Sequence, residues 1–443
     1  MTRRRSKFFR DPIHGYIEVD KEFLPIIDSP FFQRLRRIKQ LAFTNFVYHG
    51  AEHSRFGHCL GAFDLASELT ERLRIGDKTK KDEFRLAALL HDIGHPPCSH
   101  AFESVLESIH SDRKHEDYTE AIIRFTEIGD IIDGLGLSKD TIVKLIKGKY
   151  VEDPKLSYLN DLISSELDVD RLDFLLRDSY YCGVPYGKYD LPRLLLAIKK
   201  RRGLVVVDEK ARHAAESFIL ARFWMYTQVY THHTRRAFDI MLKSIFSKEV
   251  VKNVDYPSTS KRKIGRLLNY DDSWLIRQIK KIATSKSKYK NEAIIAQRLL
   301  RREPLRRVIE KIAYMERDSK RVDPDFSAIE TLESFKDEIA KKARADPSFI
   351  FVDKPWKDLP FESKYRQYGK EDDGGAIRLL FRDGKIRDIA NDPSSLAYNV
   401  SKWMARVVRI YTLKEKRDKI GRVIAKKCPN LERLLITKKD DSR

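Results

Sequence analysis

The stretch Ala87-Ala-Leu-Leu-His-Asp-Ile-Gly-His95 carries the strongest fold signal in this sequence. Its apolar residues predict a helix from about Lys81 to His95, which Pro96-Pro97 ends. That helix delivers His91 and Asp92 to one end of a core, where burying an unpaired carboxylate is costly. A metal ion removes this cost, because imidazole and carboxylate are both good ligands for Fe, Mn, Zn or Ni. The stretch therefore predicts a metal site; a hydrogen-bonded pair without metal is the alternative.

Other histidines and acids surround this pair in the sequence. Eight of the twelve histidines lie between positions 49 and 115, so we expect the chemistry there. His58, in His53-Ser-Arg-Phe-Gly-His58, is the upstream candidate ligand, and Asp170 is the downstream one. Three aspartates compete with Asp170, namely Asp168, Asp173 and Asp178. Seven further histidines divide into two groups. Three are expected to support the ligands or face the substrate (His95, His100 and His115), and four are expected at surface or core positions (His14, His49, His110 and His213).

The composition fits a globular protein with a polyanionic partner. The 443 residues carry a net charge of +21, which favours nucleotides, nucleic acid or a membrane surface. A solvated surface, such as that of a heat-adapted protein, is the alternative. No apolar run is long enough for a transmembrane helix, and the charged start does not fit a secretory signal. None of the four cysteines forms a Cys-x-x-Cys pair, so a thiolate zinc site or a redox motif is not indicated. We expect a protein of the reducing cytoplasm that is not bound to a membrane.

Hydrophobic periodicity predicts a mainly α protein with a small C-terminal α+β module. Four segments are expected: a strand and helix segment (1–50), a helical catalytic domain (51–250), a helical basic region (251–344) and the α+β module with a tail (345–443). Strands are expected at 13–19, 203–208 and 348–352, with a hairpin at 377–389. Helices are expected at 58–73, 157–179, 212–246 and 393–410, and basic loop with surface helix at 252–290.

Several motifs follow one another in an order that is typical of one enzyme family. They are Phe9-Arg-Asp-Pro-Ile-His-Gly15, Phe32-Gln-Arg-Leu-Arg-Arg-Ile-Lys-Gln-Leu41, His53-Ser-Arg-Phe-Gly-His-Cys-Leu-Gly61, Leu90-His-Asp-Ile-Gly-His95, Ser99-His100, Lys114-His-Glu116 and Asp168-Val-Asp-Arg-Leu-Asp-Phe-Leu-Leu-Arg-Asp178. Through them the sequence resembles the HD-domain superfamily of metal-dependent phosphohydrolases. It is most similar to the deoxynucleoside triphosphate triphosphohydrolases, of the SAM-and-HD-domain type and its bacterial relatives. The resemblance implies an HD-domain helical catalytic core that hydrolyses a dNTP to deoxynucleoside and inorganic triphosphate.

The resemblance also implies a role for individual residues. The metal ligands of the family fall on His58, His91, Asp92 and Asp170. Its catalytic histidines fall on His95, His100 and His115, with Glu103 as the orienting carboxylate. Water attacks the α-phosphorus, the 5′ oxygen leaves, and Mg2+ accompanies the nucleotide. The phosphate-binding positions fall on Arg55, Arg171 and Arg222, and the sugar-binding positions on Gln40, Asp178 and Tyr230.

Two departures from the family pattern lie near these residues. Gly94-His-Pro-Pro-Cys-Ser-His100 has Pro96 where the family has glycine, which restricts the loop, and Cys98 where the family has an aromatic residue. Phe174 stands at the substrate position of a phosphate-binding tyrosine, so one hydroxyl donor is missing. Both changes bear on substrate preference rather than on hydrolysis.

Regulation and function keep open alternatives. Positions that hold an activating guanine nucleotide (dGTP or GTP), between subunits of a homo-oligomer (dimer or tetramer), fall on Lys7, Asp28, Gln33 and Arg36. Alternatively, Asp28-Ser-Pro-Phe31 is simply a helix N-cap with proline in the first turn. Other functions that fit are an HD phosphohydrolase or phosphodiesterase acting on another nucleotide, and a nucleic-acid-binding protein with a vestigial metal site. Weak nucleic-acid binding is expected from the basic stretches 252–290 and 414–427.

Overall fold

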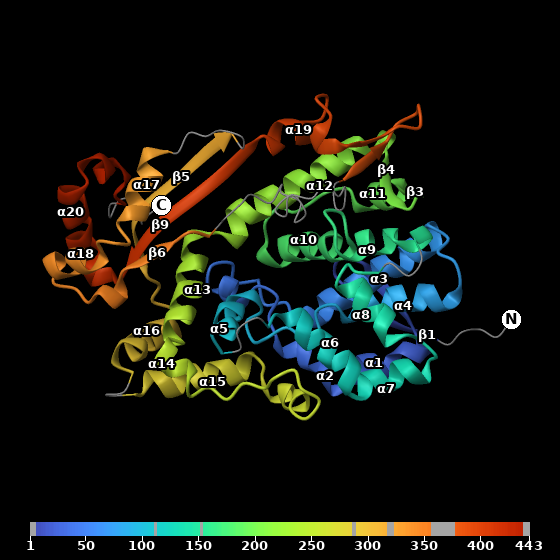
Figure 1. Cartoon of the computed structure of the whole chain (residues 1–443), viewed down its shortest axis with the longest axis horizontal. Helices are drawn as coiled ribbons and strands as arrows, with labels where there is room; N and C mark the ends of the chain where they lie inside the picture. The colour runs from blue at the N-terminus through green and yellow to red at the C-terminus, as the bar shows by residue number, and fades with distance from the viewer. Residues whose placement is uncertain are drawn as a thin grey trace. The chain divides into compact units, whose positions relative to one another are not determined.

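The computed structural model describes residues 6–109, 113–150, 154–285, 289–316, 323–355 and 377–436. Within these ranges the chain is mainly helical and has three small sheets, which confirms the predicted fold class (Figure 1). His110 lies outside the described residues, as do short parts of the predicted segments 1–50, 51–250, 251–344 and 345–443.

Contacts between residues divide the chain into two compact units, each made of three separate stretches. Unit 1 contains residues 1–225, 248–278 and 363–398, and unit 2 contains residues 226–247, 279–362 and 399–443. The four continuous segments expected from the sequence group residues by composition rather than by contact. Their boundaries therefore stay a prediction.

Three helices form the centre of unit 1. The helix α3 (Arg55–Arg72) packs against both α4 (Lys78–Leu90) and α10 (Val169–Cys182), as Figure 1 shows. Both α4 and α10 begin at an aspartate whose side chain accepts a backbone N–H, Asp77 from Lys80 and Asp168 from Arg171. The expected helices at 58–73 and 81–95 correspond to α3 and α4. The second of these ends at Leu90, and His91 to His95 follow in turns.

Further helices surround these three or belong to unit 2. In chain order they are α1 (Leu24–Asp28), α2 (Pro30–Arg34), α5 (His100–Ile109), α6 (His115–Phe125), α7 (Glu127–Gly134), α8 (Lys139–Ile146), α9 (Tyr158–Ile163), α11 (Leu191–Ala197), α12 (Arg212–Trp224), α13 (His233–Ile245), α14 (Lys248–Val251), α15 (Asp272–Ala283), α16 (Lys290–Leu300), α17 (Pro324–Thr331), α18 (Lys336–Ala343), α19 (Leu396–Ser401) and α20 (Arg417–Lys427).

Two long helices expected from the sequence are interrupted. The helix expected at 157–179 is α9 followed by α10, because Asp168 caps a new helix just before the candidate ligand Asp170. The helix expected at 212–246 is α12, a π-helical segment (Met225–Tyr230) and α13. There the His232 side chain accepts the N–H of Thr234 and so starts α13 anew.

The strands form three sheets in the described chain. Strand β1 (Ser6–Asp11) pairs with β2 (Gly15–Asp20), which covers the strand expected at 13–19. A second sheet has the order β3-β4-β7-β8, built from β3 (Ile198–Arg201), β4 (Leu204–Asp208), β7 (Arg378–Leu380) and β8 (Ile386–Asp388). The third has the order β5-β9-β6, built from β5 (Arg306–Glu316), β6 (Phe351–Asp353) and β9 (Trp403–Thr412).

The C-terminal strands correct part of the sequence interpretation. The hairpin at 377–389 is confirmed as β7 and β8, but β7 pairs in parallel with β4 of unit 1 rather than with the strands of the expected module. The expected helix at 393–410 is wrong after Ser401, where the chain becomes β9. Residues Val407 to Thr412 are mostly β-branched or aromatic, and antiparallel pairing with β5 outweighs the helical spacing.

Candidate metal centre

Four side chains from three helices meet in unit 1, and we call them the HD centre: His58, His91, Asp92 and Asp170. His58 lies in the first turn of α3, and Asp170 lies in the first turn of α10. His91 is the residue that ends α4, and Asp92 follows it. The packing of α3 against α4 and α10 therefore brings together residues that are more than a hundred positions apart.

The facing atoms of this group are crowded. The Nε2 atoms of His58 and His91 are 3.2 Å apart, and Asp170 Oδ1 is 3.1 Å from the first and 3.7 Å from the second. Asp92 turns one oxygen to each imidazole, at 3.5 Å in both cases. Ligands bound to one ion at about 2.0–2.2 Å lie at comparable distances from each other.

Hydrogen bonds on the far side of each ring show what the facing nitrogens can do. His91 Nδ1 lies 2.8 Å from the carbonyl oxygen of Ala88, which can only accept, so Nδ1 carries the proton. His58 Nδ1 lies 2.8 Å from Asp173 Oδ2 and donates in the same way. In their neutral forms both rings then direct an Nε2 lone pair at the same point. Two lone pairs cannot hydrogen-bond each other, whereas a divalent transition metal fits this donor set.

The electrostatics of the centre favour a positive charge. Burial opposes protonation of His58, but hydrogen bonds to Asp170 and Asp173 outweigh it and raise the pKa of His58 to about 10. Burial likewise opposes ionisation of Asp92, yet Arg55, His91 and His95 hold the pKa of Asp92 well below its usual range. A bound cation would satisfy the same excess of negative charge.

Asp173 supports the centre from behind and was not assigned this role from the sequence. It is fully buried, and besides His58 it accepts hydrogen bonds from Arg177, at 2.8 Å from both Nε and Nη2, and from His14 Nε2 at 2.7 Å. Arg177 also binds Asp11, at 2.8 and 3.2 Å. The motif Phe9–Gly15 thus reaches a ligand of the centre through two buried charged side chains.

Gly61 makes this arrangement possible. It lies one turn after His58 in α3, and a Cβ atom there would be 1.8 Å from Asp173 Oδ1 and 2.6 Å from Arg177 Nη2. No side chain can occupy this position while Asp173 stays in place. The glycine therefore lets α10 approach α3 closely enough for Asp173 to hold His58.

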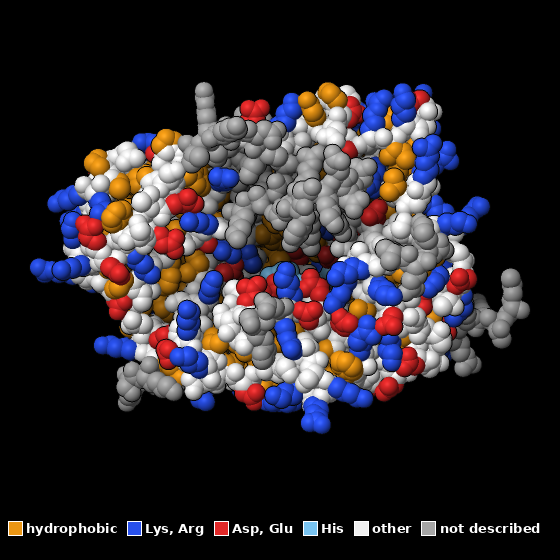
Figure 2. Space-filling model, in the orientation of Figure 1, with side chains coloured by type: hydrophobic (Ala, Val, Ile, Leu, Met, Phe, Trp, Pro, Cys, Tyr) orange, Lys and Arg blue, Asp and Glu red, His pale blue; other side chains and the backbone are white. Residues whose placement is uncertain are grey.

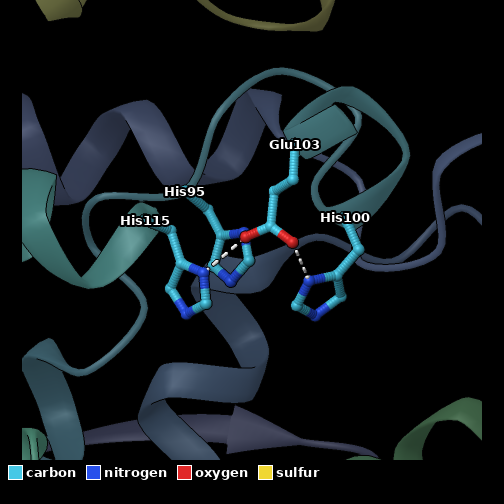
Figure 3. A group of neighbouring side chains, drawn as sticks. All are labelled: His95, His100, Glu103 and His115. Atoms are coloured by element: carbon cyan, nitrogen blue, oxygen red, sulfur yellow. Dashed lines mark hydrogen bonds and ion pairs between the residues drawn. The ribbon is translucent and has the colours of Figure 1, made fainter. Parts of the chain in front are cut away.

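A second group lies next to the HD centre, and we call it the His95 cluster: His95, His100, Glu103 and His115. Figure 3 shows the Glu103 carboxylate between two rings, with His115 Nδ1 at 2.5 Å from one oxygen and His100 Nδ1 at 2.8 Å from the other. His95 stacks on His115 at 4.0 Å between centroids, and its Nε2 is 3.2 Å from Asp92 Oδ1. Burial opposes ionisation of Glu103, but His100 and His115 outweigh it and lower the pKa of Glu103.

The side chains that were expected to bind the phosphates and the sugar have different partners in the structure. The three arginines each pair with a carboxylate: Arg55 with Asp92, Arg171 with Asp168 and Arg222 with Glu166. Gln40 is buried, and Asp178 binds His53 Nε2 at 2.7 Å. The Phe174 ring stands 6.4 Å from the His58 ring. Tyr230 belongs to unit 2, at the end of the π-helical segment.

The residues expected to hold a guanine nucleotide include one contacting pair. Arg36 Nε donates to Gln33 Oε1 at 2.8 Å, and the guanidinium of Arg36 lies over the Phe56 ring. Asp28 is exposed at the end of α1, and Lys7 lies on β1. The cap of α2 is Ser29, which accepts the N–H of Phe32, with Pro30 in the first turn. The N-cap interpretation is therefore confirmed for Ser29, and Asp28 is left free of that task.

The departures in the loop before α5 coincide with an unusual backbone. Cys98 and Ser99, just after Pro96-Pro97, have φ angles of +54° and +52°, in the left-handed region. The Asp272 carboxylate accepts a hydrogen bond from the Cys98 N–H at 2.7 Å, and Arg55 Nε donates to Ser99 Oγ at 2.7 Å. The loop that leads to His100 is thus fixed at both of these residues.

Comparison with known proteins decides the family. The HD domain model matches residues 55–173, and the HD associated region model matches residues 189–374. The uncharacterized protein YwfO of Bacillus subtilis is 32% identical, over 89% of this chain and 89% of its own length. The chain belongs to the HD-domain phosphohydrolases. A solved structure described as a phosphohydrolase from Bacteroides thetaiotaomicron superposes with a TM-score of 0.71 at 25% identity, covering 92% of this chain and all of its own.

A relative named for a specific activity matches a shorter range. The deoxynucleoside triphosphate triphosphohydrolase SAMHD1 homolog of Dictyostelium discoideum is 31% identical over 56% of this chain and 50% of its own length. The chain thus spans about half the length of that HD-domain relative. In the part of the chain that the structure describes, no helix is both long and apolar enough to cross a membrane.

Membership in the HD-domain phosphohydrolases implies a divalent metal, and the HD centre has the donor set for one. The sequence predicted that these four residues lie together. It did not predict the hydrogen-bonded network on the Nδ1 side of the His58 ring, which consists of Asp173, Arg177, Asp11 and His14. The motif containing Asp11 and His14 was visible, and its spacing gave no sign of the partner 159 residues away. His14 was expected to be a surface or core histidine; its side chain is 5% exposed and hydrogen-bonds to Asp173.

Proposed function

We propose that this HD-domain phosphohydrolase hydrolyses deoxynucleoside triphosphates to deoxynucleoside and inorganic triphosphate, with His58, His91, Asp92 and Asp170 as metal ligands. One observation carries the proposal: two imidazole nitrogens and two carboxylates converge directly beside a carboxylate that holds two further histidines. A metal centre and a proton donor are the two parts that such a reaction needs. The activity in the name of the Dictyostelium relative supports the choice of substrate.

A metal bound at the HD centre would polarise the α-phosphate and make the attacking water more acidic. His100 is the proposed donor to the leaving 5′ oxygen. A carboxylate only accepts hydrogen bonds, so Glu103 keeps a proton on His100 Nδ1 and leaves Nε2 for the substrate. His100 is exposed at the start of α5, where a nucleotide can reach it. The His95 ring meets the His100 ring edge-on at 4.9 Å between centroids, and His95 in turn stacks on His115.

Arginines and aromatic residues are proposed to hold the rest of the nucleotide. Arg55, Arg171 and Arg222 would exchange their present carboxylate partners for phosphate oxygens, which a guanidinium also binds with charge-assisted, often bidentate hydrogen bonds. Gln40 and Asp178 are proposed to face the deoxyribose, and the sugar-binding role of Tyr230, which belongs to unit 2, stays a prediction from the family resemblance. Phe174 offers no hydroxyl, so the phosphates depend more strongly on the arginines.

Product identification tests the proposal. Metal-loaded protein is incubated with an equimolar mixture of all dNTPs and NTPs, and the products are separated by ion exchange. We expect deoxynucleosides and intact triphosphate, with the NTPs left unchanged. Release of orthophosphate or pyrophosphate would instead indicate an HD phosphohydrolase acting at another bond or on another nucleotide.

We also infer that a guanine nucleotide activates the enzyme as a homo-oligomer, through Lys7, Asp28, Gln33 and Arg36. The exposed Asp28 carboxylate can accept from guanine N1–H and its 2-amino group, and it is not used as a helix cap. The test compares turnover of dATP with and without GTP for wild type and Asp28→Asn, with sedimentation of both. Activation that survives unchanged in Asp28→Asn would overturn this assignment.

A further inference from the structure

The His95 cluster has features of a cation site in its own right. Each of its four residues offers one ligand atom, and these atoms all lie within 4.8 Å of one another. The other group of this kind found among the described residues is His58, His91 and Asp170 of the HD centre. The members come from three places, namely the turn after α4, the start of α5 and the start of α6 (Figure 3). Three imidazoles and one carboxylate form a donor set that suits Zn2+ and similar transition metals.

One residue of the cluster, His95, lacks the hydrogen bonds that a buried imidazole normally makes. Its side chain is 1% exposed, and neither ring nitrogen makes a hydrogen bond. A buried polar group without a partner costs about 1–3 kcal/mol, so such groups are rare unless a ligand completes them. The contact of Nε2 with Asp92 Oδ1 at 3.2 Å lacks hydrogen-bond geometry. A cation between the rings would use a lone pair that is otherwise idle.

The other three residues can change from hydrogen bonding to coordination with little movement. Glu103 already lies within 2.5 Å of His115 Nδ1 and 2.8 Å of His100 Nδ1. A cation that enters between the carboxylate and the rings would displace these two ring protons to solvent. The His100 side chain is 63% exposed, so the path from solvent to the cluster is open.

We propose that His95, His100, Glu103 and His115 form a second divalent-cation site, for Zn2+ or a cation of similar softness, whose occupation stops hydrolysis. The inhibitory effect rests on the proposed function, whereas the site itself does not. A ring held by a cation at one nitrogen cannot also carry the two protons of an imidazolium. His100 then keeps one N–H that is much less acidic than that of an imidazolium, so it is a poor proton donor to the leaving oxygen. Excess Zn2+ therefore acts as an inhibitor of the Mn2+-loaded enzyme.

Cobalt titration tests the site directly. Co2+ is added to metal-free full-length protein, and bound metal and the visible absorption of four-coordinate Co2+ are followed together. We expect two equivalents in wild type, and one in His115→Gln, with the absorption of the second equivalent lost. Asp170→Asn should show the reverse pattern, losing the HD centre and keeping the second site. Thermal melting of each variant confirms that it is folded.

A matched control separates the cluster from ordinary histidine–carboxylate pairs. His213 binds Glu216 three residues later, at 3.0 Å, with the same spacing as His100 and Glu103, but it stands alone on the surface. His213→Gln should keep both equivalents. Binding of one equivalent in wild type, or of a second equivalent that survives in His115→Gln, would overturn the site. If the site holds but dNTPs are not hydrolysed, the function fails and the site stands.

Discussion

Asp173 holds the proposed metal ligand His58 without facing the metal itself. It accepts from His58, His14 and Arg177 in a fully buried position, so each of its two oxygens is used twice. Supporting partners of this kind fix the orientation of a ligand ring and raise its basicity.

Asp173→Asn should weaken metal retention by about tenfold or more, because partners of this type typically contribute 10–100-fold to metal affinity. The asparagine side chain has nearly the same shape as that of aspartate, but it lacks the negative charge that binds both Arg177 and His14. The measurement is the rate of metal transfer to a chelator, with metal content read by mass spectrometry. Arg85→Gln is the matched control, since it removes a partly buried ion pair with Asp20 but touches no ligand. Equal transfer rates in wild type and Asp173→Asn would contradict the role of Asp173.

Asp92→Ala should abolish both metal retention and turnover. The change removes a proposed ligand and leaves Arg55 buried without its carboxylate partner. Asp92→Asn serves as a second variant, because it preserves volume and part of the hydrogen bonding. Metal content and dNTP hydrolysis are measured on the same samples. Unchanged turnover in either variant would refute the assignment of the site.

Gly61→Ala should lower the free energy of unfolding by about 1–3 kcal/mol or more, as overpacking in a filled core does. The added methyl group meets Asp173 at 1.8 Å, so α3 and α10 must separate. Denaturant unfolding measures the effect. Gly134→Ala, at a helix position with no atom within 4 Å of the new Cβ, should cost nothing by comparison.

Elements differ in how far the sequence could predict them. The helices α3 and α4 follow from local apolar spacing, so the sequence places His58 near the start of one and His91 and Asp92 at the end of the other. Strand β9 was missed because its partner β5 lies about a hundred residues earlier, and pairing overrides local helical spacing there. The role of Asp173 depends on contacts with β1–β2 and α3, which no local pattern encodes. The choice of Asp170 over Asp173 as a ligand rested on the family resemblance. In the structure Asp170 faces Nε2 of both imidazoles, whereas Asp173 binds Nδ1 on the far side of His58.

The start of α13 should make unit 2 sensitive to acid. Burial lowers the pKa of His232 to about 4, with help from Arg409 and Arg307, and its neutral ring caps α13. The unfolded histidine has a pKa near 6.5, so the unfolded chain takes up more protons as the pH falls from about 6.5 to 4. Stability is therefore present above this window and is lost on going down through it.

We expect that urea unfolding of the protein at pH 5 is easier than at pH 7 by about 1 kcal/mol from this residue, after allowance for partial exposure. His232→Asn keeps a good N-cap that does not titrate, so its loss of stability between the two pH values should be smaller. An identical loss in wild type and His232→Asn would show that the cap is not involved.

The whole molecule carries its excess positive charge without a single dominant basic patch on the face that Figure 2 shows, where Lys and Arg alternate with Asp and Glu. The basic run Lys261 to Lys263 is exposed, whereas Tyr256, Ile264 and Leu267 anchor the same stretch in unit 1. The part of this segment from 252 to 278 is thus built into unit 1 as well as charged at its surface. A charge of +21 still favours the approach of polyphosphate substrates.

Hydrolysis in water enriched with ¹⁸O tests the central claim most directly, because it reports which bond the whole enzyme cuts. If water attacks the α-phosphorus of a dNTP, one labelled oxygen enters the released triphosphate and none enters the deoxynucleoside. Mass spectrometry of both products reads this distribution. Label in the 5′ hydroxyl of the nucleoside, or in orthophosphate, would contradict the proposed reaction at the HD centre.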